Sequence, residues 1–328
     1  MNQEASSSDI SLEERLASWR QEQYAIASQV IIREDPPCWK DTDRFKCIPL
    51  HDEMNTLFGG VDVSFPSHEE HASVAVYVVL DSKTNEIVYQ DYEYFHLCVP
   101  YVSSYLSFRE IEPLTRLITK QQLQAPQFLP RAILVDGNGI LHARHAGIAC
   151  FLGVRTKIPT IGVGKSLYYQ GGLTRELVDA GLNASLKAMM DNTVDEWSTL
   201  ATNSKVLLID KQTIVARDEE KELAMDADTS FTREAAIQQL AEHDCQGLAV
   251  KLQDDEGRIL AAALLGHGGK ITQGVGTKNP IYISVGHDTS LEEAIKICTG
   301  LSLARIPEPV RQADLLGRDL LRKNENKI

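Results

Sequence analysis

Residues 131–139 read RAILVDGNG, an apolar strand that is followed at once by an acid and two glycines. A strand without alternating polar residues is typical of sheets that are covered on both faces. Asp136 stands at the carboxyl end of this strand, where open α/β sheets bind their ligands. The small residues after it allow a large ligand to approach the backbone. The stretch therefore predicts an α/β fold with Asp136 as a candidate ligand of a metal ion, and an Asp that only caps a turn is the equal alternative.

Upstream of this strand, residues 59–65 (GGVDVSF) form a second apolar stretch, which Asp62 interrupts. The segments 71–80 and 86–92 are rich in β-branched and apolar residues. Three such strands joined by short loops predict an antiparallel meander. A charge inside a core strand is costly unless it is paired or binds a metal. Asp62 is therefore the second candidate ligand.

Downstream of residue 131, apolar strands alternate with amphipathic helices, which predicts parallel strands with crossover helices. We therefore expect an α/β mixed sheet, an antiparallel meander followed by parallel strands, flanked by helices. Helices are expected at about 12–31, 107–122, 145–152, 174–190, 291–298 and 308–322, and further strands at 158–163, 258–265 and 281–285.

The length of 328 residues fits one large domain or two average ones. We expect a single catalytic domain over 11–322, with a disordered tail at 1–10 and a short tail at 323–328. The net charge is −13, and residues 191–256 carry 16 acidic and 6 basic side chains, a net of −10 that leaves −3 for the rest. Nucleic-acid binders are usually basic, but this charge is concentrated in one region. We interpret about 191–244 as an acidic insertion on the surface.

The six cysteines are scattered and form no C-x-x-C pair. This argues against a disulfide framework and structural zinc, and it suits a reducing compartment. The first residues lack the basic and apolar regions of a signal peptide, and no apolar run approaches the ~20 residues that span a bilayer. We expect an intracellular protein, in the cytoplasm, the nucleus or both, without a membrane partner.

Two further acids complete a pattern. Glu110 falls in the first turn of the helix expected from residue 107, where the helix dipole favours an acid without any function. Together, however, Asp62, Glu110 and Asp136 follow the order in which ribonuclease H-like nucleases place their acids. In that fold a fourth acid comes from the last helix, and Asp314 occupies this place. Such sites hold two Mg²⁺ ions about 3.5–4 Å apart, and all-oxygen ligands suit Mg²⁺ or Mn²⁺.

The local sequences around these acids resemble the endonuclease V family. Six motifs carry the resemblance: residues 60–64, 100–102 with 106–110, 135–149, 162–165, 283–287 and 306–314. Together they cover roughly 25–186 and 245–322 in the family's order, and the eukaryotic branch is the most similar.

The resemblance implies an endonuclease that cuts the second phosphodiester bond 3′ to inosine in RNA, or to deoxyinosine in DNA, and leaves 3′-hydroxyl and 5′-phosphate ends. It implies that Asp62, Glu110, Asp136 and Asp314 bind metal, with Mg²⁺ as cofactor and Mn²⁺ as a substitute. Lys165 would meet the scissile phosphate or orient the attacking water.

The resemblance also implies contacts with the substrate. Hypoxanthine lacks the exocyclic amines of adenine and guanine, so a tight pocket with a backbone donor near its oxygen can select it. An aromatic wedge suits the gap that an extruded base leaves in the stack. By motif position, the residues of the pocket are Leu106, Gly137, Gly139 and His142, and those of the wedge are Tyr101 and Val102. Arg109 would either support Glu110 or contact a phosphate. His287 would either contact a phosphate or lie in a helix-capping loop.

Ser103 and Ser104 stand where many members have Pro and then Gly, which leaves the rigidity of the wedge open and favours single-stranded or RNA substrates. Two other functions stay open: an inosine-RNA binding protein without catalysis, and a ribonuclease H-like nuclease without base preference. We expect a monomer. The choice between RNA and DNA, the protein partners and the role of the insertion also stay open.

Overall fold

The computed structural model describes residues 11–34, 56–66, 72–97, 99, 102–191, 206–209, 247–266 and 279–325. The expected tail at 1–10, the end of the tail at 326–328, most of the acidic insertion and the wedge residue Tyr101 lie outside the described residues.

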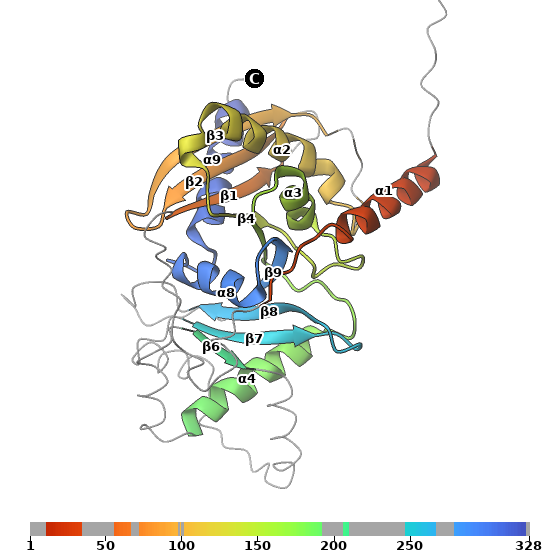
Figure 1. Ribbon diagram of the computed structural model, residues 1–328, viewed down its shortest axis with the longest axis vertical. Helices are drawn as coiled ribbons and strands as arrows, with labels where there is room; N and C mark the ends of the chain where they lie inside the picture. Colours follow the sequence, from red (N-terminus) through yellow and green to blue (C-terminus); the bar gives the residue numbers. More distant parts are fainter. Residues whose placement is uncertain are drawn as a thin grey trace, which may run out of the picture.

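The described strands form one sheet of nine strands in the order β3-β2-β1-β4-β5-β9-β8-β7-β6 (Figure 1). Their bounds are β1 Leu57–Ser64, β2 Ser73–Asp81, β3 Glu86–Phe95, β4 Ala132–Asp136, β5 Thr160–Gly164, β6 Val206–Ile209, β7 Gly247–Gln253, β8 Ile259–Gly266 and β9 Ile281–His287. β1, β2 and β3 form an antiparallel meander, and β1, β4 and β5 run parallel. The predicted mixed, ribonuclease H-like fold class is confirmed.

The second half of the sheet differs from the expected parallel strands. β9 pairs antiparallel with β5 and β8, and β8 pairs antiparallel with β7. A parallel pair needs a crossover connection, usually a helix, and the sequence predicts none between 258–265 and 281–285. The strands β6 and β7 were not predicted, and β6 lies within the range of the acidic insertion and pairs parallel with β7.

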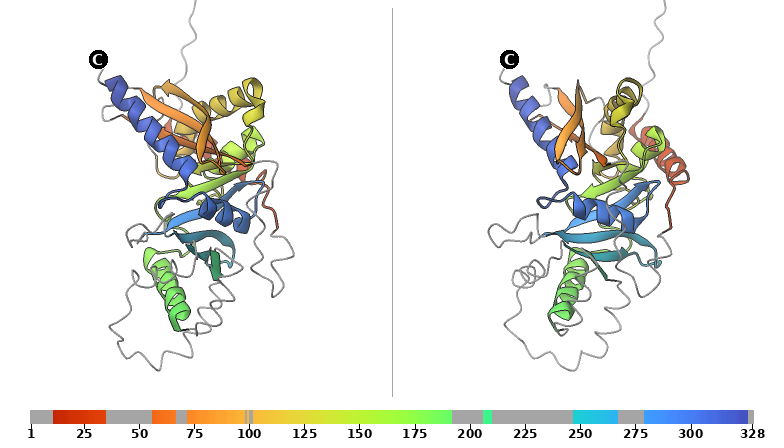
Figure 2. Two further views of the ribbon diagram at one scale, coloured as in Figure 1. Left: turned by 90° about the vertical axis from the view of Figure 1, so that its left-hand side faces the viewer. Right: turned by 60° about the vertical axis from the view of Figure 1, so that its left-hand side comes forward.

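Helices cover both faces of the sheet (Figure 2). Their bounds are α1 Leu12–Ala27, α2 Ser107–Gln124, α3 Ile148–Thr156, α4 Arg175–Asp191, α8 Leu291–Gly300 and α9 Glu308–Glu325. Alternate side chains of β2 divide between two cores: Ala75 and Tyr77 pack toward α2 and α3, and Val76 and Val78 pack toward α9. A strand whose side chains are buried on both faces is expected to be apolar throughout, as β2 is. In the described part of the chain, no helix is long and apolar enough to cross a membrane.

Candidate active site

The register of two central strands sets Asp62 and Asp136 side by side. β1 and β4 are parallel, and Val61 pairs with Val135, so each acid follows directly at the carboxyl end of the paired segment. The two carboxyl groups are in hydrogen-bond contact. Ser64, two residues after Asp62, donates its hydroxyl to the Asp62 carboxylate at 3.3 Å. Both acids therefore lie at the sheet edge where α/β folds bind ligands.

The glycines after Asp136 allow the loop to pack closely against α3 and β9. Gly137 has φ +144°, and a Cβ atom there would lie 2.6 Å from Ile148 Cγ2. A Cβ atom on Gly139 would lie 2.0 Å from the Val285 carbonyl oxygen. The amide of Gly139 donates to Ser284 Oγ at 2.8 Å. This amide holds the loop against β9, and only glycine fits at either position.

Glu110 is buried, although its sequence position alone favoured the surface. It lies in the first turn of α2 and is 6% exposed. Burial raises its pKa to about 8, and the negative charges of Asp62 and Asp136 act in the same direction. The pKa of Asp62 is also raised to about 8. Burial is the largest cause, followed by the hydrogen bond with Asp136 and the charge of Asp136. Glu110 and Asp62, two carboxyl groups whose pKa values are raised in this way, would be stabilised by added positive charge.

Lys165 supplies one such charge. It follows β5 directly, and its ammonium group lies 2.5 Å from the Asp136 carboxylate. Burial alone would lower the pKa of Lys165, but Asp136, Asp62 and Asp314 outweigh it and raise the pKa. The arrangement keeps Lys165 protonated beside the acids.

Arg305, whose role no local motif signalled, holds the backbone that carries Lys165. Its guanidinium donates to the carbonyl oxygens of Lys165 at 2.6 Å, Pro280 at 2.8 Å and Asn279 at 3.1 Å. These contacts join the chain before α9 to the segments after β5 and before β9. Only the fold could reveal them, because the partners are 25 to 140 residues distant in sequence.

Asp314 reaches the same edge of the sheet from α9. Its charge acts on both Asp62 and Lys165, and its carboxylate pairs with Arg318 at 2.7 Å. α9 approaches β1 closely because Gly60 has no side chain: a Cβ atom there would lie 2.2 Å from the Pro309 backbone. The structure therefore brings the five residues predicted to be catalytic into one cluster.

The residues predicted to contact the base come from the segment before α2 and the loop after β4. Leu106 precedes α2 and is 40% exposed, and Val102 lies four residues before it. His142 is buried, and its ring lies 5.2 Å from the ring of Tyr168. Burial, then the charge of Arg144, lowers the pKa of His142 to about 4. His142 is therefore a neutral hydrogen-bonding group at physiological pH.

Arg109, predicted to support Glu110 or to contact a phosphate, has clear structural partners. Arg109 lies over the ring of Phe65, with 5.3 Å from its central carbon to the ring centroid, and its charge lowers the pKa of Glu110 against the larger effect of burial. This position fits support of Glu110.

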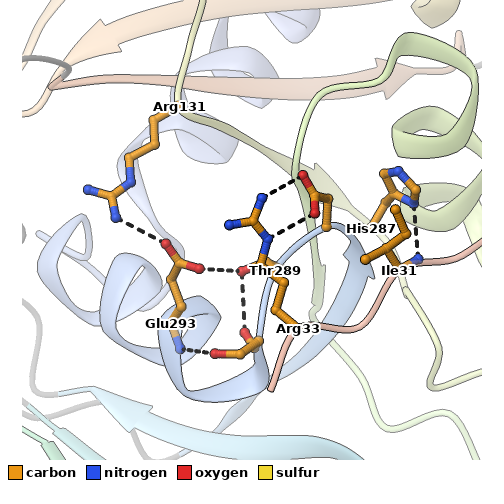
Figure 3. Close-up of polar contacts among 8 residues, drawn as sticks. Ile31, Arg33, Arg131, His287, Thr289 and Glu293 are labelled. Atoms are coloured by element: carbon orange, nitrogen blue, oxygen red, sulfur yellow. Dashed lines mark hydrogen bonds and ion pairs between the residues drawn. The ribbon is translucent and has the colours of Figure 1, made fainter. Parts of the chain in front are cut away.

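His287 lies at the opposite end of β5 from Lys165, because it pairs with Thr160, the first residue of that strand. Its Nδ1 accepts the backbone N–H of Ile31 at 3.3 Å, and the ring is buried (Figure 3). Asp288 and Thr289 follow it and lead to Ser290, which caps α8. The position favours the second prediction, a place in the loop before a helix, over a phosphate contact.

The donor set suits a hard divalent cation, since it consists of carboxylate oxygens. Among the described residues, no three metal-binding side chains already stand at the spacing that holds one ion. Lys165 occupies the position next to Asp136, and Asp314 is turned toward Arg318. Burying acids next to one another is unfavourable without positive charge, so these residues fit a metal ion that would displace the Lys165 and Arg318 contacts.

The strand order, with acids from β1, α2, β4 and α9 at one edge of a mixed sheet, defines a ribonuclease H-like nuclease. The model of the Endonuclease V family matches residues 43–217 and 231–315. The chain belongs to the endonuclease V family. It is a nuclease, an enzyme that hydrolyses phosphodiester bonds.

Known relatives agree with this assignment. Endonuclease V of Homo sapiens is 31% identical over 312 residues, which cover 95% of this chain and 85% of that protein. The crystal structure of the catalytic domain of human Endonuclease V matches with a TM-score of 0.64 and 30% identity, over 96% of this chain and 99% of that one. Endonuclease V of Ciona intestinalis, in complex with a 23mer DNA containing an inosine followed by a ribo-adenosine, matches with a TM-score of 0.65 and 26% identity, over 96% of this chain and 99% of that one.

Proposed function

We propose that this chain is a divalent-metal-dependent endonuclease that hydrolyses the second phosphodiester bond 3′ to inosine in RNA, and to deoxyinosine in DNA, leaving 3′-hydroxyl and 5′-phosphate ends. The observation that carries the proposal is the cluster of Asp62, Glu110 and Asp136, three acids drawn together at one sheet edge at a cost in electrostatic energy. The match to an inosine-containing complex of a relative supports the choice of base.

Four acids would hold the metal: Asp62, Glu110, Asp136 and Asp314. When bound, Mg²⁺ or Mn²⁺ would activate water and neutralise charge on the phosphate. Lys165 is the positive group that contacts Asp136, and it would leave Asp136 to donate to a non-bridging oxygen of the scissile phosphate. Arg305 would keep the Lys165 backbone in place during this exchange.

Base selection would fall to the loop beyond β4 and to the segment before α2. Leu106 is exposed enough to contact an extruded base. Gly137 and Gly139 let the loop beyond β4 pack closely, and its backbone would line one side of the base pocket. Val102, with Tyr101, would fill the gap in the stack. We expect replacement of Leu106 or His142 to reduce inosine preference before it reduces cutting, because both are assigned to the base pocket and not to the metal site.

The proposal is tested by cleavage of matched single-stranded oligonucleotides that carry one central inosine, deoxyinosine or adenosine, in Mg²⁺, Mn²⁺ or EDTA. Asp62→Asn is the inactive control. We expect metal-dependent cutting one nucleotide beyond inosine, faster on RNA and absent in Asp62→Asn. Equal cutting at adenosine would leave only a nuclease without base preference, and tight inosine binding without cutting in any metal would contradict the proposal.

The setting of the reaction is part of the proposal. Cys150 and Cys298 are free and buried in the core, which suits a reducing environment. We place the enzyme inside the cell, in the cytoplasm, the nucleus or both, and we expect it to act as a monomer. Sedimentation of the purified protein, alone and with an oligonucleotide, would test the last point.

A further inference from the structure

One backbone carbonyl beside the proposed base pocket receives three hydrogen-bond donors. The oxygen of Ser104 accepts from the Gln23 amide at 2.9 Å, the Arg144 guanidinium at 2.9 Å and His142 Nε2 at 3.0 Å. The Arg144 backbone N–H donates to Nδ1 of His142 at 3.3 Å, so the proton of the neutral ring is on Nε2. Arg144 Nε also donates to the Gln23 side-chain oxygen. Few carbonyl groups are held by so many side chains.

The residue that is held in this way has an unusual backbone. Ser104 has φ +68°, and the carbonyl of Val102 accepts the N–H of Tyr105 at 3.0 Å, which closes a tight turn. Positive φ at the third position of such a turn favours Gly or Asn. A serine persists there only where its surroundings determine the conformation. The Ser104 hydroxyl also contacts the Tyr168 hydroxyl at 2.5 Å.

Gln23 comes from α1, and α1 is itself fixed to the catalytic core. Trp19 stacks on Phe108 of α2 with ring centroids 4.9 Å apart, and Glu22 pairs with Arg155 of α3 at 3.0 Å. After α1, residues 31–33 are bound to the loop before α8 (Figure 3): Ile32 bridges Thr289, and Arg33 pairs with Asp288 at 2.8 Å. Gln23 is fully buried. A rigid helix therefore carries the donor to Ser104.

We infer that Gln23 and Arg144 are positioning residues, which hold the turn at 102–105 in the shape that lets Val102 enter the base stack and Leu106 face the extruded base. The inference rests on the proposed function and adds α1 to the base-recognition apparatus. In this chain the anchor takes the place of the Pro and Gly of many family members, because a serine cannot set this turn by its own backbone preference.

A loosened turn would affect some substrates more than others. In a duplex, extrusion of a base costs stacking and pairing energy, and a wedge that fills the gap recovers part of it. In a single strand little must be recovered. Loss of the anchor is therefore expected to raise KM on duplex substrates and to leave kcat on single strands close to that of the wild type, because the side chain of Gln23 is hydrogen-bonded to Ser104 and Arg144 and not to the metal-binding acids.

The decisive variant is Gln23→Glu. A carboxylate in this place can still accept from Arg144, but it cannot donate to the Ser104 carbonyl and would repel it. Gln21→Glu is the matched control, since it makes the same chemical change at an exposed position of the same helix. Arg144→Gln removes a second donor from the same carbonyl. Each protein is assayed on deoxyinosine oligonucleotides, single-stranded and paired. Its active fraction is measured from the amplitude of the pre-steady-state burst.

We expect Gln23→Glu and Arg144→Gln to lower the duplex-to-single-strand ratio of kcat/KM at least fivefold, and Gln21→Glu to leave it unchanged. Fluorescence of 2-aminopurine next to deoxyinosine, with Ca²⁺ in place of Mg²⁺, reports extrusion independently and should fall in the same two variants. An equal loss on both substrates would mean a purely structural role and overturn the inference, as would an unchanged ratio. Absence of inosine preference in the wild type would instead refute the proposed function.

Discussion

At the scale of single residues, the site is dominated by acids that the fold forces together. Asp62 and Asp136 are neighbours because their strands are paired in register, and Glu110 joins them because α2 begins over the same edge. Each of these carboxyl groups would be more stable alone in water. The excess negative potential would make the edge a cation site, and it should be measurable as a stability defect in the metal-free protein.

Glu110→Gln should stabilise the metal-free protein. The pKa of Glu110 is raised from 4.5 to about 8 by burial and by the neighbouring acids. Between these values the unfolded state is ionised while the folded state holds the proton, so wild-type stability falls as the pH rises through this window. Glutamine does not titrate, and the gain should be absent below pH 4.5 and reach on the order of 2 kcal/mol at pH 7.

Thermal unfolding in EDTA across pH 4 to 9 measures this gain. Addition of Mg²⁺ should stabilise the wild type and have less effect on Glu110→Gln, which has lost one ligand. If the variant is less stable than the wild type at pH 7 in EDTA, the prediction that the buried Glu110 carboxyl destabilises the metal-free protein is wrong.

At the scale of elements, two contacts decide whether the acids meet. The loop after β5 is held by Arg305, and α9 rests directly on β1 at Gly60. Both contacts join parts of the chain that are far apart in sequence. Neither Arg305 nor Gly60 itself touches the proposed substrate, so substitutions of these two residues separate geometry from chemistry.

Arg305→Ala should lower kcat about tenfold without changing the ratio of inosine to adenosine cleavage, because a small displacement of a catalytic group is costly while the base pocket is untouched. Arg305→Lys should restore only part of the rate, since an ammonium group cannot reach three carbonyls in the planar geometry of a guanidinium. Steady-state cleavage of single-stranded inosine RNA is the measurement. A change in base preference would contradict this assignment of Arg305.

Gly60→Ala should destabilise the protein by about 1–3 kcal/mol, which is typical of overpacking in a core. The new methyl group would meet the Pro309 backbone, which cannot move without shifting α9 and Asp314. Urea unfolding gives the loss of stability, and activity at saturating Mg²⁺ should fall as well. A variant with wild-type stability would show that α9 can adjust its distance from β1.

At the scale of the whole molecule, a chain of net charge −13 must bring a polyanion to an acidic site. Much of this charge lies between residues 191 and 256, and the run 217–222 contains four acids. Like-charge repulsion of this kind slows association and is screened by salt. This repulsion would weaken the binding of all nucleic acids, so that only substrates with additional contacts in the site would bind well.

Replacement of Asp218, Glu219, Glu220 and Glu222 by their amides should therefore lower KM for an inosine oligonucleotide roughly two- to fivefold at low salt. The difference should vanish at high salt, where charges are screened, and kcat should not change. Kinetics at two salt concentrations test this. A change in kcat, or a difference that persists at high salt, would point to a direct role of the run instead of a long-range charge effect.

The sequence by itself determined the order of the acids, the antiparallel meander and the apolar strands, because these depend on local patterns of apolar and polar residues. It could not place Glu110, which reads as a surface residue until α2 is packed over the sheet, nor predict β6, β7 and the antiparallel β9. Only the tertiary structure brought Gln23 and Arg144 to the Ser104 carbonyl, Arg305 to the Lys165 backbone, and His287 to the opposite end of β5. Such contacts join residues that are distant along the chain, and they are decided by which faces pack together.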